Sequence, residues 1–105
     1  MTHALLESLR SGMSPYQGVA GLRRKEARIV ELIAATGRVS RVGLFDALFP
    51  GSSAKKANSA VNAQMRNVRQ KLRPYDIEIE TLIGAGYKMT DENVAKLREL
   101  ANVDQ

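Results

Sequence analysis

The side chains in this sequence that could do chemistry are arginines, asparagines and glutamines gathered in one stretch, residues 59–73. At helical spacing, four apolar residues of the stretch point in one direction: Val61, Met65, Val68 and Leu72. The other side then carries Ala63, Arg66, Asn67 and Gln70, with Asn62, Arg69 and Arg73 along one edge. Arginine, asparagine and glutamine offer paired donors and acceptors that match guanine and adenine edges in the DNA major groove. The stretch therefore predicts a helix that reads bases, and the small Ala63 would permit close approach.

The distribution of charge favours a polyanionic partner for this stretch. The chain of 105 residues has 16 lysines and arginines against 11 aspartates and glutamates, a formal net charge of +5. Between Ser53 and Tyr75 there is no acidic residue, and the basic residues are Lys55, Lys56, Arg66, Arg69, Lys71 and Arg73. Exposed helix faces normally mix both signs of charge. The acid-free stretch therefore favours binding over a surface that is only solvated.

Further basic residues are candidates for phosphate contacts, which position a protein on DNA without reading its sequence. Lys55 and Lys56 lie in the polar stretch 50–59, which we expect to be a loop; the alternative is that this loop serves only solubility. Arg41 follows a predicted helix start. It either contacts the DNA backbone there or makes no contact with DNA, and the sequence favours neither alternative. Lys88 lies on the second strand of a predicted hairpin and could reach a groove.

Catalysis and cofactor binding find little support in the composition. The chain has no cysteine and one histidine, His3. Disulfides, thiolate metal sites and cysteine nucleophiles are therefore excluded, and an imidazole centre would have a single candidate near the terminus. Glu78 and Glu80 lie two apart on a predicted strand, where a solvated face explains them better than acid–base chemistry. We expect no enzymatic activity, cofactor or metal.

The cellular location follows from what the sequence lacks. No apolar run is long enough to span a membrane, and the first residues show no secretory-signal pattern. We therefore expect a cytoplasmic protein without a membrane partner. If it binds DNA, it associates with the nucleoid.

The elements that must position the binding residues begin with helices. Apolar residues at helical spacing predict helices over about 23–36 and 59–73, with Gly37 as the left-handed C-cap of the first. Ser40 is expected to cap a second helix that ends before Pro50.

A change of period after the third helix predicts a hairpin. Residues 77–83 alternate as a strand, 84–86 form the turn, and 87–89 return as a second strand. Thr90 or Asp91 then caps a C-terminal helix. Its apolar stripe of Val94, Leu97 and Ala101 has two interpretations, packing onto its own domain or contact in a homodimer.

These elements predict an α+β fold that is mainly α. The architecture is a winged helix-turn-helix, with a three-helix core, a C-terminal β-hairpin wing and an extra C-terminal helix. The domain spans 22–89. It is preceded by the segment 1–21, with a short helix around Leu5, Leu6 and Leu9, and followed by the helix in 90–105.

Several stretches in this order resemble the C-terminal effector domain of the OmpR/PhoB class of response regulators. They are LRRKEARIVELI at 22–33, GRVS at 37–40, VRQKL at 68–72 and GAGYKM at 84–89, and the resemblance covers about two thirds of the chain. It implies a third helix in the major groove and a wing near the adjacent minor groove. It also implies Asn62, Arg66, Asn67, Arg69 and Arg73 as DNA-facing positions and a loop at 46–58 that contacts RNA polymerase.

The chain departs from this family in four ways, one of which is Ala27 where a large aromatic residue is usual. Ile83 stands where a basic wing residue is usual, which weakens the case for a minor-groove contact. Residues 1–21 show no strand alternation to match the family's N-terminal sheet, and no receiver domain is expected. The first hypothesis is therefore a sequence-specific regulator that binds double-stranded DNA. The alternatives are a protein-interaction winged helix that modulates RNA polymerase or another regulator, and a non-specific DNA binder.

Overall fold

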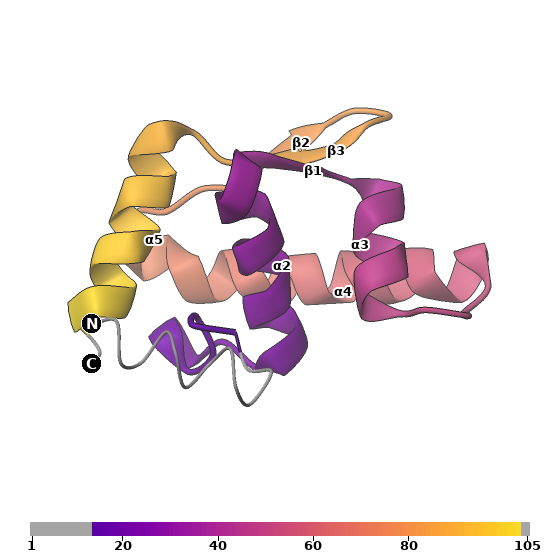
Figure 1. Cartoon of the computed structure of the whole chain (residues 1–105), viewed down its shortest axis with the longest axis horizontal. Helices are drawn as coiled ribbons and strands as arrows, with labels where there is room; N and C mark the ends of the chain where they lie inside the picture. Colours follow the sequence, from indigo (N-terminus) through magenta and orange to yellow (C-terminus); the bar gives the residue numbers. More distant parts are fainter. Residues whose placement is uncertain (1–13, 104–105) are drawn as a thin grey trace.

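The computed structural model describes residues 14–103 and shows an α+β architecture that is mainly helical (Figure 1). Its α-helices are α2 (Arg24–Thr36), α3 (Arg41–Leu48), α4 (Ala54–Leu72) and α5 (Asp91–Val103). Its strands are β1 (Arg38–Ser40), β2 (Glu80–Leu82) and β3 (Gly86–Lys88), and its short 3-10 helices are Val19–Gly21 and Arg73–Tyr75. The predicted helix around Leu5, Leu6 and Leu9 lies outside the described residues.

The three strands form one antiparallel sheet in the order β1–β3–β2. Tyr87 of the central strand pairs with Val39 on one side and Thr81 on the other. The hairpin between β2 and β3 was predicted and is confirmed, but its strands are shorter than 77–83 and 87–89 suggested. Strand β1 was not predicted, because three residues directly after a helix cap are too few to show alternation.

Gly86 allows the sheet to close around β3. A Cβ atom built at this position would lie 2.1 Å from the carbonyl oxygen of Val39 and 2.8 Å from the Cα of Ser40, and the φ angle is 155°. No side chain fits such an approach, so β1 and the hairpin lie as close as they do because residue 86 is a glycine.

The predicted caps at both ends of the α2–α3 connection are confirmed. Gly37 adopts the left-handed conformation with φ of 89°, and its N–H donates to the Ile33 carbonyl at 2.7 Å. The Ser40 hydroxyl accepts from the N–H of Gly43 at 2.9 Å and so begins α3. Thr90 does the same for α5, accepting from the N–H of Asn93 at 3.2 Å. These caps fix where each helix begins or ends.

Helix α4 begins earlier than predicted, and the loop assigned to 50–59 is wrong over its second half. The Ser53 hydroxyl accepts from the N–H of Lys56 at 3.3 Å, and the helix starts at Ala54. Ala57 is 2% exposed and continues the buried stripe one turn before Val61. A single alanine carries too weak a hydrophobic signal for the sequence pattern to include that turn.

The core lies between the helices and one face of the sheet. Its fully buried large side chains include Ile29, Ile33, Leu44, Met65, Val68, Leu72 and Leu97. The α5 stripe of Val94, Leu97 and Ala101 belongs to this core, so the helix packs onto its own domain, as one interpretation predicted. These three side chains are therefore not available for the alternative, a homodimer contact.

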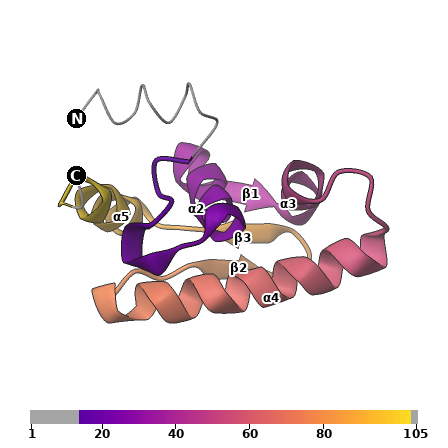
Figure 2. The same ribbon diagram turned by 90° about the horizontal axis from the view of Figure 1, so that it is seen from below.

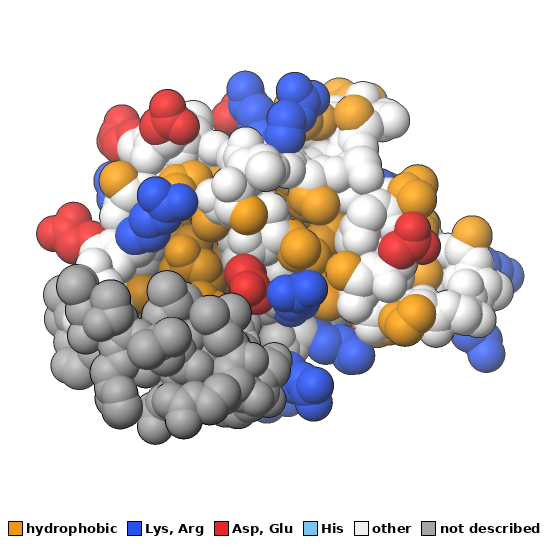
Figure 3. Space-filling model, in the orientation of Figure 1, with side chains coloured by type: hydrophobic (Ala, Val, Ile, Leu, Met, Phe, Trp, Pro, Cys, Tyr) orange, Lys and Arg blue, Asp and Glu red, His pale blue; other side chains and the backbone are white. Residues whose placement is uncertain are grey.

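The arrangement leaves α4 with a long free side. Figure 2 shows α4 running along one edge of the molecule, past α2 and α3, with the sheet beside it. In the orientation of Figure 1, α4 passes behind α2. The opposite face, seen in Figure 3, carries both basic and acidic side chains.

Candidate nucleic-acid interface

The outward side of α4 is an exposed surface of basic, amide and small side chains. Eight predicted site residues are exposed on or directly after this helix: Lys55, Lys56, Asn62, Ala63, Arg66, Asn67, Gln70 and Arg73. The corrected helix start places Lys55 and Lys56 on its first turn instead of in a loop. At 100° per residue, Lys55 falls on the same side as Arg66 and Arg73. The exposed surface thus follows a helix of 19 residues, about 28 Å long.

A groove lies between this helix and the β2–β3 hairpin. Its volume is about 510 Å³, and it is lined by Arg41, Asn62, Met65, Arg66, Arg69, Gln70, Arg73, Thr81 and Tyr87. Four of these residues are arginines and none is acidic. We call this feature the arginine groove. Guanidinium groups are the side chains best suited to bind phosphate and carboxylate oxygens.

Arg41 ties the start of α3 to both walls of the arginine groove. Its Nε donates to the Asn58 Oδ1 at 2.8 Å, and its terminal nitrogens donate to the Asn62 Oδ1 and the Tyr87 hydroxyl. The guanidinium therefore serves to hold α3, α4 and β3 together. The side-chain oxygen of Asn62 already accepts a hydrogen bond from Arg41. The amino group of Asn62 therefore remains available to donate to a ligand.

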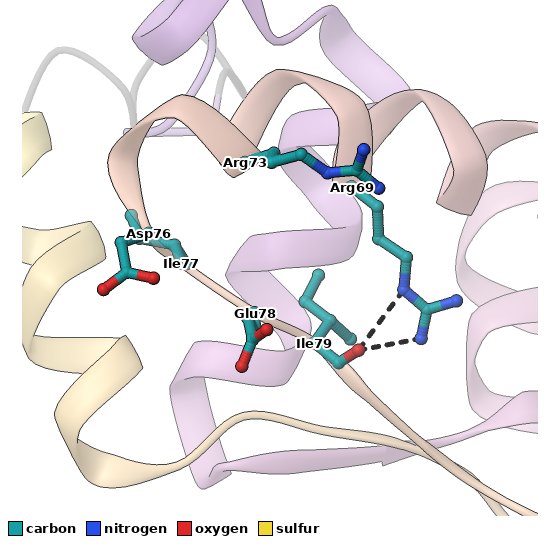
Figure 4. Close-up of a pocket in the computed structure, with 6 residues that line it drawn as sticks. All are labelled: Arg69, Arg73, Asp76, Ile77, Glu78 and Ile79. Atoms are coloured by element: carbon teal, nitrogen blue, oxygen red, sulfur yellow. Dashed lines mark hydrogen bonds between the residues drawn. The ribbon is translucent and has the colours of Figure 1, made fainter.

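Arg69 ties α4 to the hairpin in the same way. Its Nε and Nη2 donate to the Ile79 carbonyl at 3.2 and 2.8 Å, and Nη2 also donates to the Thr81 hydroxyl at 2.8 Å. Figure 4 shows Arg69 reaching from α4 to Ile79, while Arg73 comes from the end of the same helix. Arg69, predicted to face DNA, is thus half-buried and engaged within the protein.

A second cavity borders these two arginines away from the groove. It measures about 170 Å³ and is also lined by Asp76, Ile77, Glu78 and Ile79 (Figure 4). These acids lie on the chain between α4 and β2. They limit the positive surface at the C-terminal end of α4.

The Arg69 contacts lead to a testable expectation for the hairpin. Arg69→Ala removes three charge-assisted hydrogen bonds and should lower the free energy of unfolding by about 1–3 kcal/mol. The loss should be concentrated in the hairpin, because Ile79 and Thr81 lose their anchor on α4. Amide hydrogen exchange of β2 and β3 measures this directly. Arg73→Ala, which removes the same charge from the exposed helix end, serves as the control. Equal exchange in the two variants would contradict the anchoring role.

Five predicted site residues do not line the arginine groove: Lys55, Lys56, Ala63, Asn67 and Lys88. The first three lie on the exposed side of α4, whereas Lys88 and Asn67 face away from the groove. Lys88 alternates with Tyr87 along β3, so it faces the other side of the sheet, where its Nζ lies 3.8 Å from a Glu80 oxygen. Asn67 remains exposed but lies on the α2 side of α4, near Glu26. The structure therefore brings Arg41, Asn62, Arg66, Arg69, Gln70 and Arg73 together and separates Lys88 and Asn67 from them.

Glu26 is a buried carboxylate behind this interface. It accepts from the N–H of Arg23 at 2.9 Å and from the Lys71 ammonium at 2.5 Å. Burial raises the pKa of Glu26, but the hydrogen bonds from Arg23, Lys71 and Asn67 and the charge of Lys71 outweigh it. The net effect holds its pKa below the ordinary value, so Glu26 stays ionised and fixes α2 against α4.

Sequence reasoning missed Asn58, Thr81 and Tyr87 as parts of the site. Asn58 lies one turn before Asn62, and a helix start at Ala54 would have placed both on the groove side. Thr81 and Tyr87 are recognisable only from the register of β2 against β3. The ring of Tyr87 is buried, and its hydroxyl accepts from Arg41.

No protein-family model, curated protein or solved structure matches the chain. Among residues 14–103, no group of three or more histidine, aspartate or glutamate side chains is placed to hold a metal ion. No helix in the same part of the chain has the length and apolar character to cross a membrane.

Proposed function

We propose that this chain is a sequence-specific, double-stranded-DNA-binding regulator of transcription. The observation that carries the proposal is the acid-free exposed side of α4 beside the arginine groove. Helix α4 enters the major groove, which is about 12 Å wide and admits one α-helix. Arg66 and Gln70 are exposed there and supply the side chains that read base edges, and Ala63 allows the helix to approach closely.

The surrounding basic residues hold the phosphate backbone. The arginine groove takes one strand, with Arg66 and Arg73 free of the internal ties that hold Arg41 and Arg69. Lys55 and Lys56 lie on the first turn of α4, which contains no acidic residue. Cations at a helix N-terminus are disfavoured by the helix dipole, so their presence there is better explained by a phosphate ligand than by stability.

The architecture supports a winged helix-turn-helix in which α3 and α4 form the helix pair and the hairpin is the wing. The order of elements, one helix, a short strand, two helices and a hairpin that returns to that strand, agrees with it. The resemblance of residues 22–89 to OmpR/PhoB effector domains supports the same assignment. Under this proposal the protein acts at the nucleoid in the cytoplasm and is not an enzyme.

The experiment that tests the proposal is selection of bound sequences from a random duplex pool at near-physiological salt. We expect one enriched motif and a Kd that weakens steeply as salt rises. Arg66→Ala should weaken binding to that motif by roughly tenfold or more and relax its base preference at one position. Arg98→Ala removes the same charge from the exposed side of α5 and should leave the motif unchanged.

Three outcomes would redirect the proposal. Binding without an enriched motif would indicate a non-specific DNA binder. Equal losses in Arg66→Ala and Arg98→Ala would mean that net charge, not α4, determines affinity. Absence of DNA binding, with salt-insensitive binding to RNA polymerase or another regulator, would favour the protein-interaction alternative.

A further inference from the structure

The tip of the β2–β3 hairpin presents one large apolar side chain to solvent. Ile83 is 97% exposed, the highest value among the large hydrophobic residues described. It is followed by Gly84, Ala85 and Gly86, which are all small. Ile83 is therefore the one large side chain among residues 83–86 at the tip, and it contributes nothing to the core.

The hairpin holds this side chain in a fixed position. The turn is closed by the N–H of Ala85, which donates to the Leu82 carbonyl at 2.8 Å. The N–H of Arg41 donates to the Ala85 carbonyl at 3.2 Å and fastens the tip to the start of α3. Gly86 lies directly against β1, and Arg69 fastens the base of the hairpin to α4. The position of Ile83 relative to α4 is thus set by the folded domain.

DNA geometry then defines what Ile83 meets. The arginine groove lies between α4 and the hairpin, and its four arginines are the side chains that would contact the phosphates of a DNA strand. In duplex DNA a single strand divides the major groove from the neighbouring minor groove. If α4 occupies the major groove, the hairpin on the other side of that strand lies over the minor groove.

We propose that Ile83 enters this minor groove and favours A·T pairs there; the inference rests on the DNA-binding function proposed above. The minor groove is about 6 Å wide, a width that admits a single inserted side chain. Its floor carries a guanine amino group at G·C pairs and none at A·T pairs. An isoleucine side chain cannot accept a hydrogen bond, so contact with that amino group would desolvate a donor without replacing its partner.

A protein partner fits the same tip less well. Stable protein interfaces bury about 800 Å² on each partner. One isoleucine followed by glycines and an alanine supplies a small part of that area. The hairpin tip offers one exposed apolar side chain, Ile83, and it lies beside the arginines that line the arginine groove. Both features suit a DNA groove better than a protein surface.

The test uses the duplex selected by the wild-type protein, with 2,6-diaminopurine replacing adenine one position at a time. This base adds an amino group in the minor groove and leaves the major-groove edge of the A·T pair unchanged. At one or two adjacent positions flanking the motif, wild-type binding should weaken about tenfold. Ile83→Ala should bind the unmodified duplex about tenfold more weakly and show no further loss with the modified base. Ile83→Val should behave like the wild type.

The outcomes separate this inference from the function on which it rests. If Ile83→Ala keeps wild-type affinity and responds to 2,6-diaminopurine as the wild type does, the minor-groove role of Ile83 is overturned. Loss of binding in Arg66→Ala in the same assay would show that DNA recognition by α4 still holds. If the wild type binds no duplex, both the function and the role of Ile83 fall. Because Ile83 is exposed, each variant should unfold at the wild-type temperature.

Discussion

Replacing Gly86 with alanine is expected to lower the free energy of unfolding by about 3 kcal/mol or more. The new methyl group would lie 2.1 Å from the Val39 carbonyl oxygen, a backbone atom that cannot move without separating β1 from β3. The φ angle of 155° adds strain for any residue with a side chain. Urea-induced unfolding followed by circular dichroism measures the loss.

Gly84→Ala is the matched control for that substitution. Gly84 also has a positive φ, 76°, but no atom lies within 4 Å of the position its Cβ would take. Its cost should be limited to backbone strain of about 1–2 kcal/mol. Equal destabilisation by the two substitutions would show that backbone conformation, and not the close approach of β1, makes a glycine necessary at position 86.

Glu26→Ala is expected to destabilise the fold by about 2–4 kcal/mol. The substitution leaves the Lys71 ammonium half-buried without its carboxylate and removes the acceptor for the N–H of Arg23 at the start of α2. Denaturant unfolding gives the magnitude. Glu31→Ala on the same helix breaks only the exposed ion pair with Arg28, so it should cost no more than about 0.5 kcal/mol. A comparable loss in both variants would contradict the buried role of Glu26.

The same carboxylate makes stability depend on acid pH. Because folding lowers the pKa of Glu26, its contribution is fully present above the pKa of an unfolded glutamate, about 4.3, and is lost as pH falls through the lower folded value. Glu26→Gln keeps the shape but cannot ionise. The difference in unfolding free energy between wild type and Glu26→Gln should therefore shrink below about pH 4. A difference that stays constant from pH 7 to pH 3 would contradict this linkage.

The parts of the fold that were predictable are those with a local physical signal. Gly37 and Ser40 end and begin helices through their own backbone and hydroxyl chemistry, so their roles were visible in the sequence. The first turn of α4 was missed because Ala57 is its only buried side chain. Strand β1 was missed because its pairing with β3 depends on Gly86, nearly fifty residues later.

The candidate site divides in a similar way. Exposure of Ala63, Arg66 and Gln70 follows from the helical period and was predicted correctly. The internal engagement of Arg69 was not predictable, because its acceptors Ile79 and Thr81 come from another element. Periodicity says which side of a helix is outward, but not which outward arginine is already bonded.

The difference between the arginines that are bonded within the protein and those that are exposed has an evolutionary consequence. Arg41 and Arg69 are committed to holding α3, α4 and the hairpin together, while Arg66 and Gln70 are exposed and carry no such duty. Substitutions at exposed positions without such ties usually change stability by no more than about 0.5 kcal/mol. A lineage carrying this scaffold can therefore exchange the residues on the outer side of α4 without first having to repair the fold. Under the proposed DNA-binding function, such exchanges would give it new target sites.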